Sequence, residues 1–199
     1  MDEFKIKNVS FLKSCGTYAQ SLEVPPLPSF AFVGRSNVGK SSLLNMLTNR
    51  KSLANVSKTP GRTRLINYFQ LDGYENSIYF VDLPGYGYAA ASKKIQGGWD
   101  EEISNFLAQT ATLKQVFLLL DIRHAPSALD IAALHFLQSS EIPFTIIATK
   151  ADKFSKSGAH GAVAKLASSL GLTKNDIIVS SSEKGIGRTD ILLKVATYC

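Results

Sequence analysis

Apolar and polar residues along the chain follow two alternating patterns, which predict strands and helices in turn. Short and almost wholly apolar runs are typical of strands covered on both faces of a parallel sheet. Four such runs are SFAFV (29–33), QVFLLLD (115–121), PFTIIATK (143–150) and DIIVSS (176–181). Between and after them, apolar residues recur every three or four positions, which predicts helices. The predicted helices are 41–49, 99–113, 128–140, the segment with Val163, Leu166, Ala167 and Leu170, and 189–199.

A pair of apolar runs near the middle of the chain predicts an antiparallel hairpin. INYFQL (66–71) and SIYFVDL (77–83) lie on either side of a polar segment that contains Asp72-Gly73. Aspartate followed by glycine is a strong signal for a tight turn between two strands. Together with the alternation elsewhere, this predicts an α/β fold with a doubly wound, mostly parallel sheet and one antiparallel hairpin.

The length of the chain suits one domain preceded by a leading segment. A chain of 199 residues can bury a substantial core but is short for two α/β domains. We expect residues 1–28, with a candidate strand at 4–12, to be a lead-in that packs on the domain. Residues 29–199 form the domain itself. The polar stretch 50–63 is longer than a compact connection needs, which favours a functional loop.

Composition points to a cytoplasmic protein. Apolar residues make up 45% and charged residues 19% of the chain, as in ordinary globular proteins. No apolar run approaches the roughly 20 residues of a membrane span, so we expect no membrane partner. The first residues lack the basic-then-apolar order of a secretory signal. Only Cys15 and Cys199 are present, without metal-like spacing, which favours a reducing compartment.

The net charge of +6 leaves two interpretations open. It indicates either a protein with surplus lysine or a polyanionic partner such as RNA. Basic residues gather in 50–64, at Lys93 and Lys94, and at Lys153 and Lys156. No aromatic RNA-binding motif accompanies them, so charge alone does not decide.

The segment GRSNVGKSS (34–42) joins a predicted strand to a predicted helix. Its Gly-x4-Gly-Lys-Ser pattern is that of a phosphate-binding P-loop. Backbone N–H groups curl around phosphate oxygens, and Gly34 and Gly39 stand where a Cβ would collide. The helix that follows adds the positive end of its dipole. Lys40 supplies charge to the terminal phosphates, and the Ser41 hydroxyl is a ligand for Mg²⁺.

P-loops occur in ATPases, nucleotide kinases and GTPases, so a second motif has to decide among them. DLPG (82–85) ends a predicted strand. There, Asp82 can hold the Mg²⁺ shell and Gly85 can offer its N–H to a γ-phosphate. By itself Asp-x-Pro-Gly is also a common turn.

The motif TKAD (149–152) favours guanine. Guanine carries an N1–H and an N2 amine that one carboxylate accepts together, whereas adenine offers neither donor. Asp152 is therefore the predicted base-reading residue, and Lys150 can lay its methylene stem across the ring.

Two weaker segments complete the expected site. Ser180 to Ser182 follow the last predicted strand and resemble the GTPase loop that backs the base with main-chain N–H groups. In KTPGRT, Thr63 can complete the Mg²⁺ shell only when a γ-phosphate is present. Such a contact would order the loop with GTP and release it with GDP.

Taken together, these stretches resemble the EngB (YihA/YsxC) family of bacterial P-loop GTPases, within the TrmE-Era-EngA-EngB-Septin-like group. The stretches are GRSNVGKSSLLN, SKTPGRTRLIN, FVDLPGYGYA, LLLDIRHAPSALD and TKADK. The resemblance runs from about residue 5 to residue 195. It implies a three-layer G domain with six or seven strands, and a cytoplasmic protein that hydrolyses GTP slowly. It also implies a role in assembly of the large ribosomal subunit and in normal cell division and septation.

The resemblance assigns roles to residues by position. It places the GTP or GDP contacts at Gly34, Arg35, Ser36, Asn37, Val38, Gly39, Lys40, Ser41, Gly61, Arg62, Thr63, Arg64, Leu65, Asp82, Leu83, Pro84, Gly85, Thr149, Lys150, Ala151, Asp152, Ser180, Ser181 and Ser182. Mg²⁺ falls to Ser41 and Thr63, and catalysis to Lys40, Thr63 and Asn37. Related GTPases use an asparagine at the Asn37 position to hold K⁺, so K⁺ is a further expected cofactor.

Two positions depart from the broader GTPase pattern. Thr149 replaces an asparagine, a change that the family shares. Tyr86 follows DLPG where many GTPases carry a glutamine that orients the attacking water. A phenol lacks the paired donor and acceptor of an amide, so intrinsic hydrolysis should be slow. Whether Tyr86 meets a partner or lies buried stays open, and Arg123 with Asp130 is a candidate structural pair.

The sequence therefore predicts a monomeric GTP switch that binds the large ribosomal subunit or its RNA and proteins. In this hypothesis GTP and Mg²⁺ order residues 50–64 and roughly 84–98, and hydrolysis releases the partner. A nucleotide kinase would share the P-loop but prefer ATP. A GTP-gated RNA- or protein-binding module with incidental hydrolysis is the closer alternative.

Overall fold

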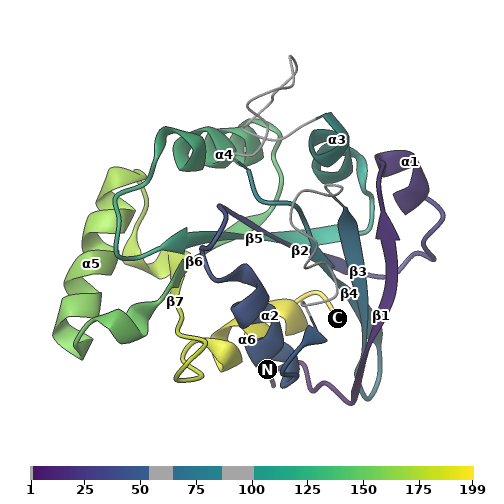
Figure 1. The fold of residues 1–199 in the computed structure, drawn as a ribbon, viewed down its shortest axis with the longest axis horizontal. Coiled ribbons are helices and arrows are strands. Elements are labelled where there is room, and N and C mark those ends of the chain that lie inside the picture. Colours follow the sequence, from purple (N-terminus) through teal and green to yellow (C-terminus); the bar gives the residue numbers. More distant parts are fainter. Residues whose placement is uncertain (1, 54–64, 87–100) are drawn as a thin grey trace.

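The computed structural model describes residues 2–53, 65–86 and 101–199. Seven strands form one sheet in the order β1-β3-β4-β2-β5-β6-β7 (Figure 1). The strands are β1 (Asn8–Cys15), β2 (Ser29–Gly34), β3 (Ile66–Asp72), β4 (Ser77–Asp82), β5 (Leu113–Asp121), β6 (Phe144–Thr149) and β7 (Ile177–Val179). Strand β3 is antiparallel to both of its neighbours, and the other pairings are parallel. The prediction of a mostly parallel sheet with one antiparallel hairpin strand is confirmed.

Helices cover both faces of this sheet (Figure 1). They are α1 (Tyr18–Ser21), α2 (Lys40–Thr48), α3 (Glu101–Gln109), α4 (Ala128–Ser139), α5 (Lys156–Ser169) and α6 (Arg188–Ala196). Helices α2 and α6 pack in one hydrophobic cluster, and α3, α4 and α5 pack in the other. The three-layer arrangement follows. Within the described ranges no helix has both the length and the apolar character to span a membrane.

Strand β2 shows how the apolar runs build two cores at once. Successive side chains on a strand point to opposite faces. Phe30 and Phe32 enter the cluster under α2 and α6, while Ala31 and Val33 enter the cluster under α3 to α5. The Phe32 ring lies 4.9 Å from the Phe80 ring and 5.0 Å from the Phe117 ring, centroid to centroid. These buried rings fix the strand from which the P-loop begins.

Some element boundaries differ from the prediction. The helix predicted over 99–113 ends at Gln109, and β5 begins at Leu113 rather than at residue 115. The reason is pairing across the sheet, because Leu113 lies opposite Ser29 of β2. The candidate strand at 4–12 is found as β1, which pairs with β3 and forms one edge of the sheet. The lead-in therefore contributes a strand to the sheet.

The parallel strands β2, β4, β5 and β6 all end on the same side of the sheet, which we call its carboxyl edge. In the register of the sheet, Phe32 lies opposite Asp82, Gly34 opposite Leu119, and Asp121 opposite Thr149. The loops that leave the carboxyl ends of parallel strands form the usual ligand site of open α/β sheets. The P-loop, DLPG, TKAD and Ser180 to Ser182 follow such ends, whereas KTPGRT belongs to the connection between α2 and β3 and lies outside the described residues.

Candidate functional site

The P-loop leaves β2 at Gly34 and enters α2 at Lys40. Gly39 caps the helix with a φ of 107°, a conformation that favours glycine. A Cβ on Gly34 would lie 2.8 Å from Val38 Cγ1 and 2.9 Å from the Leu119 carbonyl oxygen. Packing against β5 therefore requires a glycine at position 34, before any ligand is considered. The predicted collision of a Cβ is therefore found at Gly34. At Gly39 a Cβ would lie no closer than 3.9 Å to another residue of the protein, so the positive φ and not a collision within the protein favours glycine there.

The DLPG turn lies directly against the P-loop. A Cβ on Gly85 would come within 2.6 Å of the Gly34 carbonyl oxygen. The Lys40 ammonium forms an ion pair with the Asp82 carboxylate, and both side chains are largely buried. Burial lowers the pKa of Lys40, while the adjacent carboxylate favours its charged form. The lysine and the aspartate that the sequence assigned to the phosphate end of the site are thus in contact.

The base-reading end of the site is formed by the loops after β6 and β7. The Ser181 hydroxyl donates to Asp152 Oδ1 at 2.7 Å, and Lys153 Nζ lies 2.8 Å from Asp152 Oδ2. These hydrogen bonds, from Lys153 and then from Ser181, lower the pKa of Asp152 to about 2. The carboxylate is therefore ionised at neutral pH and able to accept two hydrogen bonds. Backbone bonds tie the two loops together, since the Ala151 N–H donates to the Ser180 carbonyl.

Thr149 is buried beneath the P-loop and bonds to its backbone. Its hydroxyl donates to the Val38 carbonyl oxygen at 2.7 Å and to the Leu120 carbonyl oxygen at 3.1 Å, and only 4% of the residue is exposed. A side chain committed to two carbonyls in the interior acts through the loop that it holds. The structure therefore gives Thr149 a structural role beside the partly exposed Lys150 and Asp152.

Lys150 connects the two ends of the site. It adopts a left-handed conformation with a φ of 63°, and its Nζ donates to the Asn37 carbonyl oxygen at 2.6 Å. The same Nζ lies 2.8 Å from Asp121 Oδ2. Asn37 also has a positive φ, of 62°, which asparagine tolerates better than most residues. The P-loop and the TKAD loop are thereby held at a fixed distance.

Asp121 is a site residue that the sequence analysis missed. It ends β5 and accepts hydrogen bonds from Arg123 Nε at 2.9 Å and Nη2 at 2.8 Å, besides its pair with Lys150. Burial alone would raise the pKa of Asp121, but the hydrogen bonds from Arg123 and Lys150 outweigh it and lower the pKa. The sequence did offer a signal for Asp121, because it is the one carboxylate in the apolar run QVFLLLD and stands at its end. The pairing of Arg123 with Asp130 was wrong.

Asp130 instead pairs with Tyr86. Tyr86 is 2% exposed, and its hydroxyl donates to Asp130 Oδ1 at 2.6 Å. The other oxygen of Asp130 accepts hydrogen bonds from the Ser127 N–H and hydroxyl, completing a capping box at the start of α4. Burial raises the pKa of the Tyr86 phenol. The side chain that follows DLPG is therefore buried, and its hydroxyl is committed to Asp130.

The remaining expected contacts are partly described. Arg35, Ser36 and Ser182 lie on exposed or half-buried loop positions, while Leu83 is buried. Leu65 precedes β3 and lies beside Gly16. Gly61, Arg62, Thr63 and Arg64 fall outside the described residues. Where the structure describes them, the assigned segments meet at one edge of the sheet.

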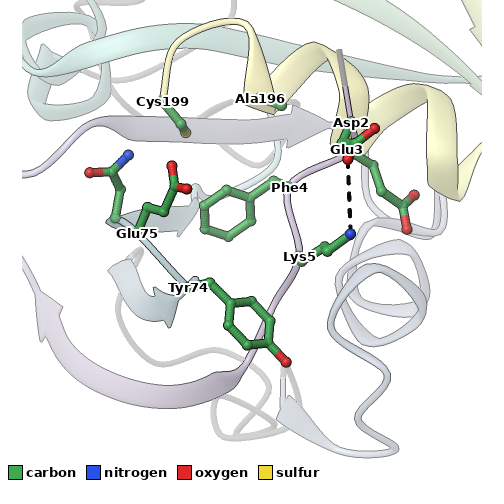
Figure 2. A pocket seen from close by; sticks show the side chains of 9 residues that line it. Asp2, Glu3, Phe4, Lys5, Tyr74, Glu75, Ala196 and Cys199 are labelled. Carbon is green, nitrogen blue, oxygen red and sulfur yellow. Dashed lines mark ion pairs between the residues drawn. The ribbon is translucent and has the colours of Figure 1, made fainter.

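A cavity near the N-terminus lies apart from this site. It has a volume of about 550 Å³ and is lined by Phe4, Tyr74, Glu75, Ala196 and Cys199, among others (Figure 2). Residues 73–76 form the turn of the β3–β4 hairpin, which lies at the opposite end of β4 from Asp82. None of the nucleotide-binding motifs named in the sequence contributes to its wall.

We expect replacement of Asp121 by asparagine to weaken GDP and GTP binding equally, by about 5- to 10-fold. The substitution removes the charge that holds Lys150 in place, and partly buried ion pairs of this kind are worth about 1 kcal/mol. The preference for guanine over adenine should survive, because Asp152 is untouched. Isothermal titration calorimetry with GDP, GTP and ADP measures all three. Glu141→Gln, an exposed carboxylate on the loop after α4, is the control, and an Asp121→Asn variant with unaltered affinities would contradict the role given to Asp121.

The sheet order and the residues at its carboxyl edge define a class of protein, the P-loop GTPases. Solved structures share the fold. A crystal structure described as a probable GTP-binding protein EngB aligns with a TM-score of 0.64 at 22% identity, over 85% of this chain and 97% of that chain. Era from Aquifex aeolicus, bound to GDP·AlF₄⁻, aligns with a TM-score of 0.64 at 21% identity, over 87% of this chain and 57% of its own.

Sequence comparison identifies the family within this class. A family profile described as "50S ribosome-binding GTPase" matches residues 29–150. The EngB protein of Pelotomaculum thermopropionicum is 44% identical over 191 residues, which cover 94% of this chain and 93% of the relative. The EngB protein of Clostridium perfringens is 45% identical over 171 residues, covering 86% and 85%. The chain belongs to the EngB family of GTP-binding proteins and is a GTPase, as the sequence predicted.

Proposed function

We propose that this protein is a slow, Mg²⁺-dependent GTPase that acts as a switch in assembly of the large ribosomal subunit in the cytoplasm. One observation carries the proposal. The ionised carboxylate of Asp152 and the P-loop lysine Lys40 both lie at the carboxyl ends of the parallel strands, where they can bind the base and the phosphates of one nucleotide. The match to a family described as ribosome-binding supports the choice of partner. A monomeric state and a role in cell division and septation remain predictions from the resemblance.

Guanine recognition rests on Asp152. Its two oxygens accept from Ser181 and from Lys153, so the carboxylate already lies among donors. In the proposal the N1–H and N2 amine of guanine donate to the Asp152 carboxylate and replace the contact that Lys153 makes with it. Lys153 has Glu183 as a second partner, at 3.3 Å, to which its ammonium can turn. The stem of Lys150 covers one face of the base.

The phosphate end of the site fits a magnesium ion. Ser41 lies in the first turn of α2 directly after Lys40, whose ammonium touches Asp82. A serine hydroxyl and an aspartate, completed by phosphate oxygens and water, are the hard oxygen ligands that Mg²⁺ prefers. Ser41 and Thr63 would hold the ion, with Asp82 in its outer shell. When bound, it would neutralise the charge that develops on the β- and γ-phosphates.

The chain's own residues then bring about hydrolysis by positioning. Lys40 binds the terminal phosphates, Gly85 donates its N–H to the γ-phosphate, and the P-loop N–H groups surround the β-phosphate. Because the Tyr86 hydroxyl is bonded to Asp130, no described side chain in the glutamine position orients the attacking water. Phosphoryl transfer depends mainly on positioning and charge, so the intrinsic rate should be slow and should respond to a partner.

The switch itself involves segments that are largely outside the described residues. Thr63 in 50–64 and Gly85 at the start of 84–98 would both contact the γ-phosphate, and GTP would thereby set the conformation of two loops at once. The alternative is a GTP-gated binding module in which hydrolysis is incidental. The two differ in whether the ribosomal particle changes the rate.

The test is single-turnover hydrolysis of GTP with and without purified bacterial large ribosomal subunits. We expect the subunits to raise the rate at least 10-fold and to bind the protein with GTP but not with GDP. Competition of labelled GTP by unlabelled ATP measures base preference in the same experiment. Binding of subunits in both nucleotide states, with no change in rate, would contradict the switch and favour the alternative module.

We expect K⁺ to accelerate hydrolysis relative to Na⁺ at equal ionic strength. The reason is the asparagine at position 37, whose side chain is the expected ligand of a monovalent cation beside the phosphates. Asn37→Gly is the matched variant, because glycine accepts the φ of 62° and removes only the side chain. The stimulation should disappear in that variant. Equal wild-type rates in KCl and NaCl would remove K⁺ from the proposal.

A further inference from the structure

Helix α5 and the segments next to it are rich in cations, and the acidic residues there, Asp152 and Asp176, lie just outside the stretch that carries them. From residue 153 to residue 175 the chain contains Lys153, Lys156, Lys165, Lys174 and His160, and no aspartate or glutamate. All five of these side chains are exposed. Helix α5 lies at one end of the sheet, beside β6 and β7 (Figure 1). This end of the molecule therefore holds a large share of the basic residues in the described chain.

Most of these charges are not neutralised within the protein. Lys153 pairs with Asp152 and Glu183. By contrast, Lys156, Lys165, Lys174 and the nearby Lys184 make no ion pair with any described carboxylate. Uncompensated cations that lie close together attract polyanions, and the attraction adds up over the surface.

Two features of α5 are unfavourable for the helix itself. Lys156 stands in the first turn, which contains no acidic residue, although the helix dipole favours negative charge there. Gly161 is a helix-interior glycine, which costs about 0.5–1 kcal/mol relative to alanine. A Cβ on Gly161 would meet no atom within 4 Å, so packing does not require glycine at this position. Helix stability therefore explains neither residue.

Recesses flank α5 on both sides. One, of about 720 Å³, lies between the helix and residues 122–126 and has Arg123, His124, Gly161 and Lys165 among its lining residues. The other, of about 820 Å³, is lined by Lys156, His160, Lys174 and Lys184, together with Asp152 of the base-reading loop. The helix is thus a ridge between two recesses, each with basic side chains on its wall.

We propose that this α5 ridge, with Lys156, Lys165, Lys174 and Lys184, binds the sugar-phosphate backbone of RNA. Lysine and arginine contacts to phosphates supply sequence-independent affinity. Cations on both sides of one helix can contact an extended chain of phosphates, and Gly161 leaves room for a close approach of that chain. A protein partner would instead need buried aromatic or arginine anchors at the centre of the surface. The proposal rests on the proposed function, in which the RNA belongs to the large ribosomal subunit.

The test compares two doubly charge-reversed variants of the full-length protein. Lys156→Glu/Lys165→Glu alters the ridge, and Lys5→Glu/Lys7→Glu makes the same charge change at exposed positions near the N-terminus. The probe is protein-free large-subunit rRNA in a filter-binding assay over a series of salt concentrations. We expect the ridge variant to bind at least 10-fold more weakly. Its slope of log affinity against log salt should fall by about 1.4–1.8, as expected for two lost phosphate contacts. GTP affinity should be unchanged in both variants.

An uncharged variant separates shape from charge. Gly161→Met fills the recess with a good helix former, so we expect weaker rRNA binding together with an equal or higher melting temperature. Equal rRNA binding by the wild type and the ridge variant would overturn the proposal, as would equal losses in the ridge and control variants. Binding of wild-type protein to intact subunits but not to rRNA would overturn it in favour of a ribosomal protein. If the wild type binds no subunits with GTP, the proposed function fails instead.

Discussion

Replacement of Asp152 by asparagine is expected to abolish the preference for guanine nucleotides. The carboxylate accepts two hydrogen bonds from the guanine edge, and hydrogen bonds to a charged group are worth about 1.5–3 kcal/mol each. Loss of both corresponds to roughly 4 kcal/mol, or about a 1000-fold fall in GDP affinity. Because the pKa of Asp152 is about 2, the wild-type preference should be the same at pH 5 and at pH 8. Calorimetric titration with GDP and ADP measures both effects.

A matched ligand shows whether this loss comes from recognition or from misfolding. Xanthine carries an oxygen where guanine carries its N2 amine, and an asparagine amide can donate to that oxygen. Asp152→Asn should therefore bind xanthosine diphosphate more tightly than the wild type does. In the same variant the Ser181 hydroxyl keeps an acceptor, because the asparagine amide oxygen can accept its hydrogen bond in place of the carboxylate. Retained guanine preference in Asp152→Asn would contradict the assignment of the base site.

Replacement of Lys40 by methionine is expected to weaken GTP binding by at least 100-fold and also to destabilise the protein. The ammonium supplies charge to the terminal phosphates in the proposed mechanism. It also pairs with Asp82, which is 6% exposed. Removal of one partner leaves an uncompensated buried charge, which costs about 3 kcal/mol or more. Chemical denaturation and nucleotide titration measure the two losses separately.

The double variant Lys40→Met/Asp82→Asn distinguishes the two losses. It removes the unpaired carboxylate together with the lysine, so most of the lost stability should return, because neutral replacements of both partners are often well tolerated. GTP affinity should stay low, since the double variant still lacks the lysine charge that binds the terminal phosphates. Recovery of GTP binding along with stability would contradict the role of Lys40 and would indicate that the single variant failed only by partial unfolding.

Tyr86 stands where many GTPases carry a glutamine, but its side chain has a different, structural contact. Tyr86 follows DLPG, so sequence comparison with other GTPases asks only what replaces their glutamine. The structure shows that the phenol bonds to Asp130 and thereby ties the end of DLPG to the capping box of α4. The segment 121–130 is therefore linked physically to the DLPG turn.

Much of the fold and site could be read from local sequence. The P-loop is contiguous: an apolar strand, a glycine-bounded turn and a helix stand side by side in the chain. The hairpin followed from Asp72-Gly73, and the Gly73 N–H indeed bonds to the Asn76 carbonyl at 2.8 Å in the turn. Asp152 could be assigned because it ends a motif directly after a buried strand. Each of these features depends on residues a few positions apart, whose geometry the backbone fixes.

Only the tertiary structure decided which distant side chains meet. Lys150 reaches the carbonyl of Asn37 across 113 positions, and Tyr86 reaches Asp130 across 44. Arg123 lies two residues from its partner Asp121, yet the sequence pointed to Asp130, because the partner of a long side chain depends on the conformation of the loop after β5. The sheet order β4-β2-β5-β6 brings these strand ends together. The sequence by itself determined the elements, the nucleotide motifs and the family; the order of the strands, which depends on packing of the whole chain, determined how their ends combine into one site.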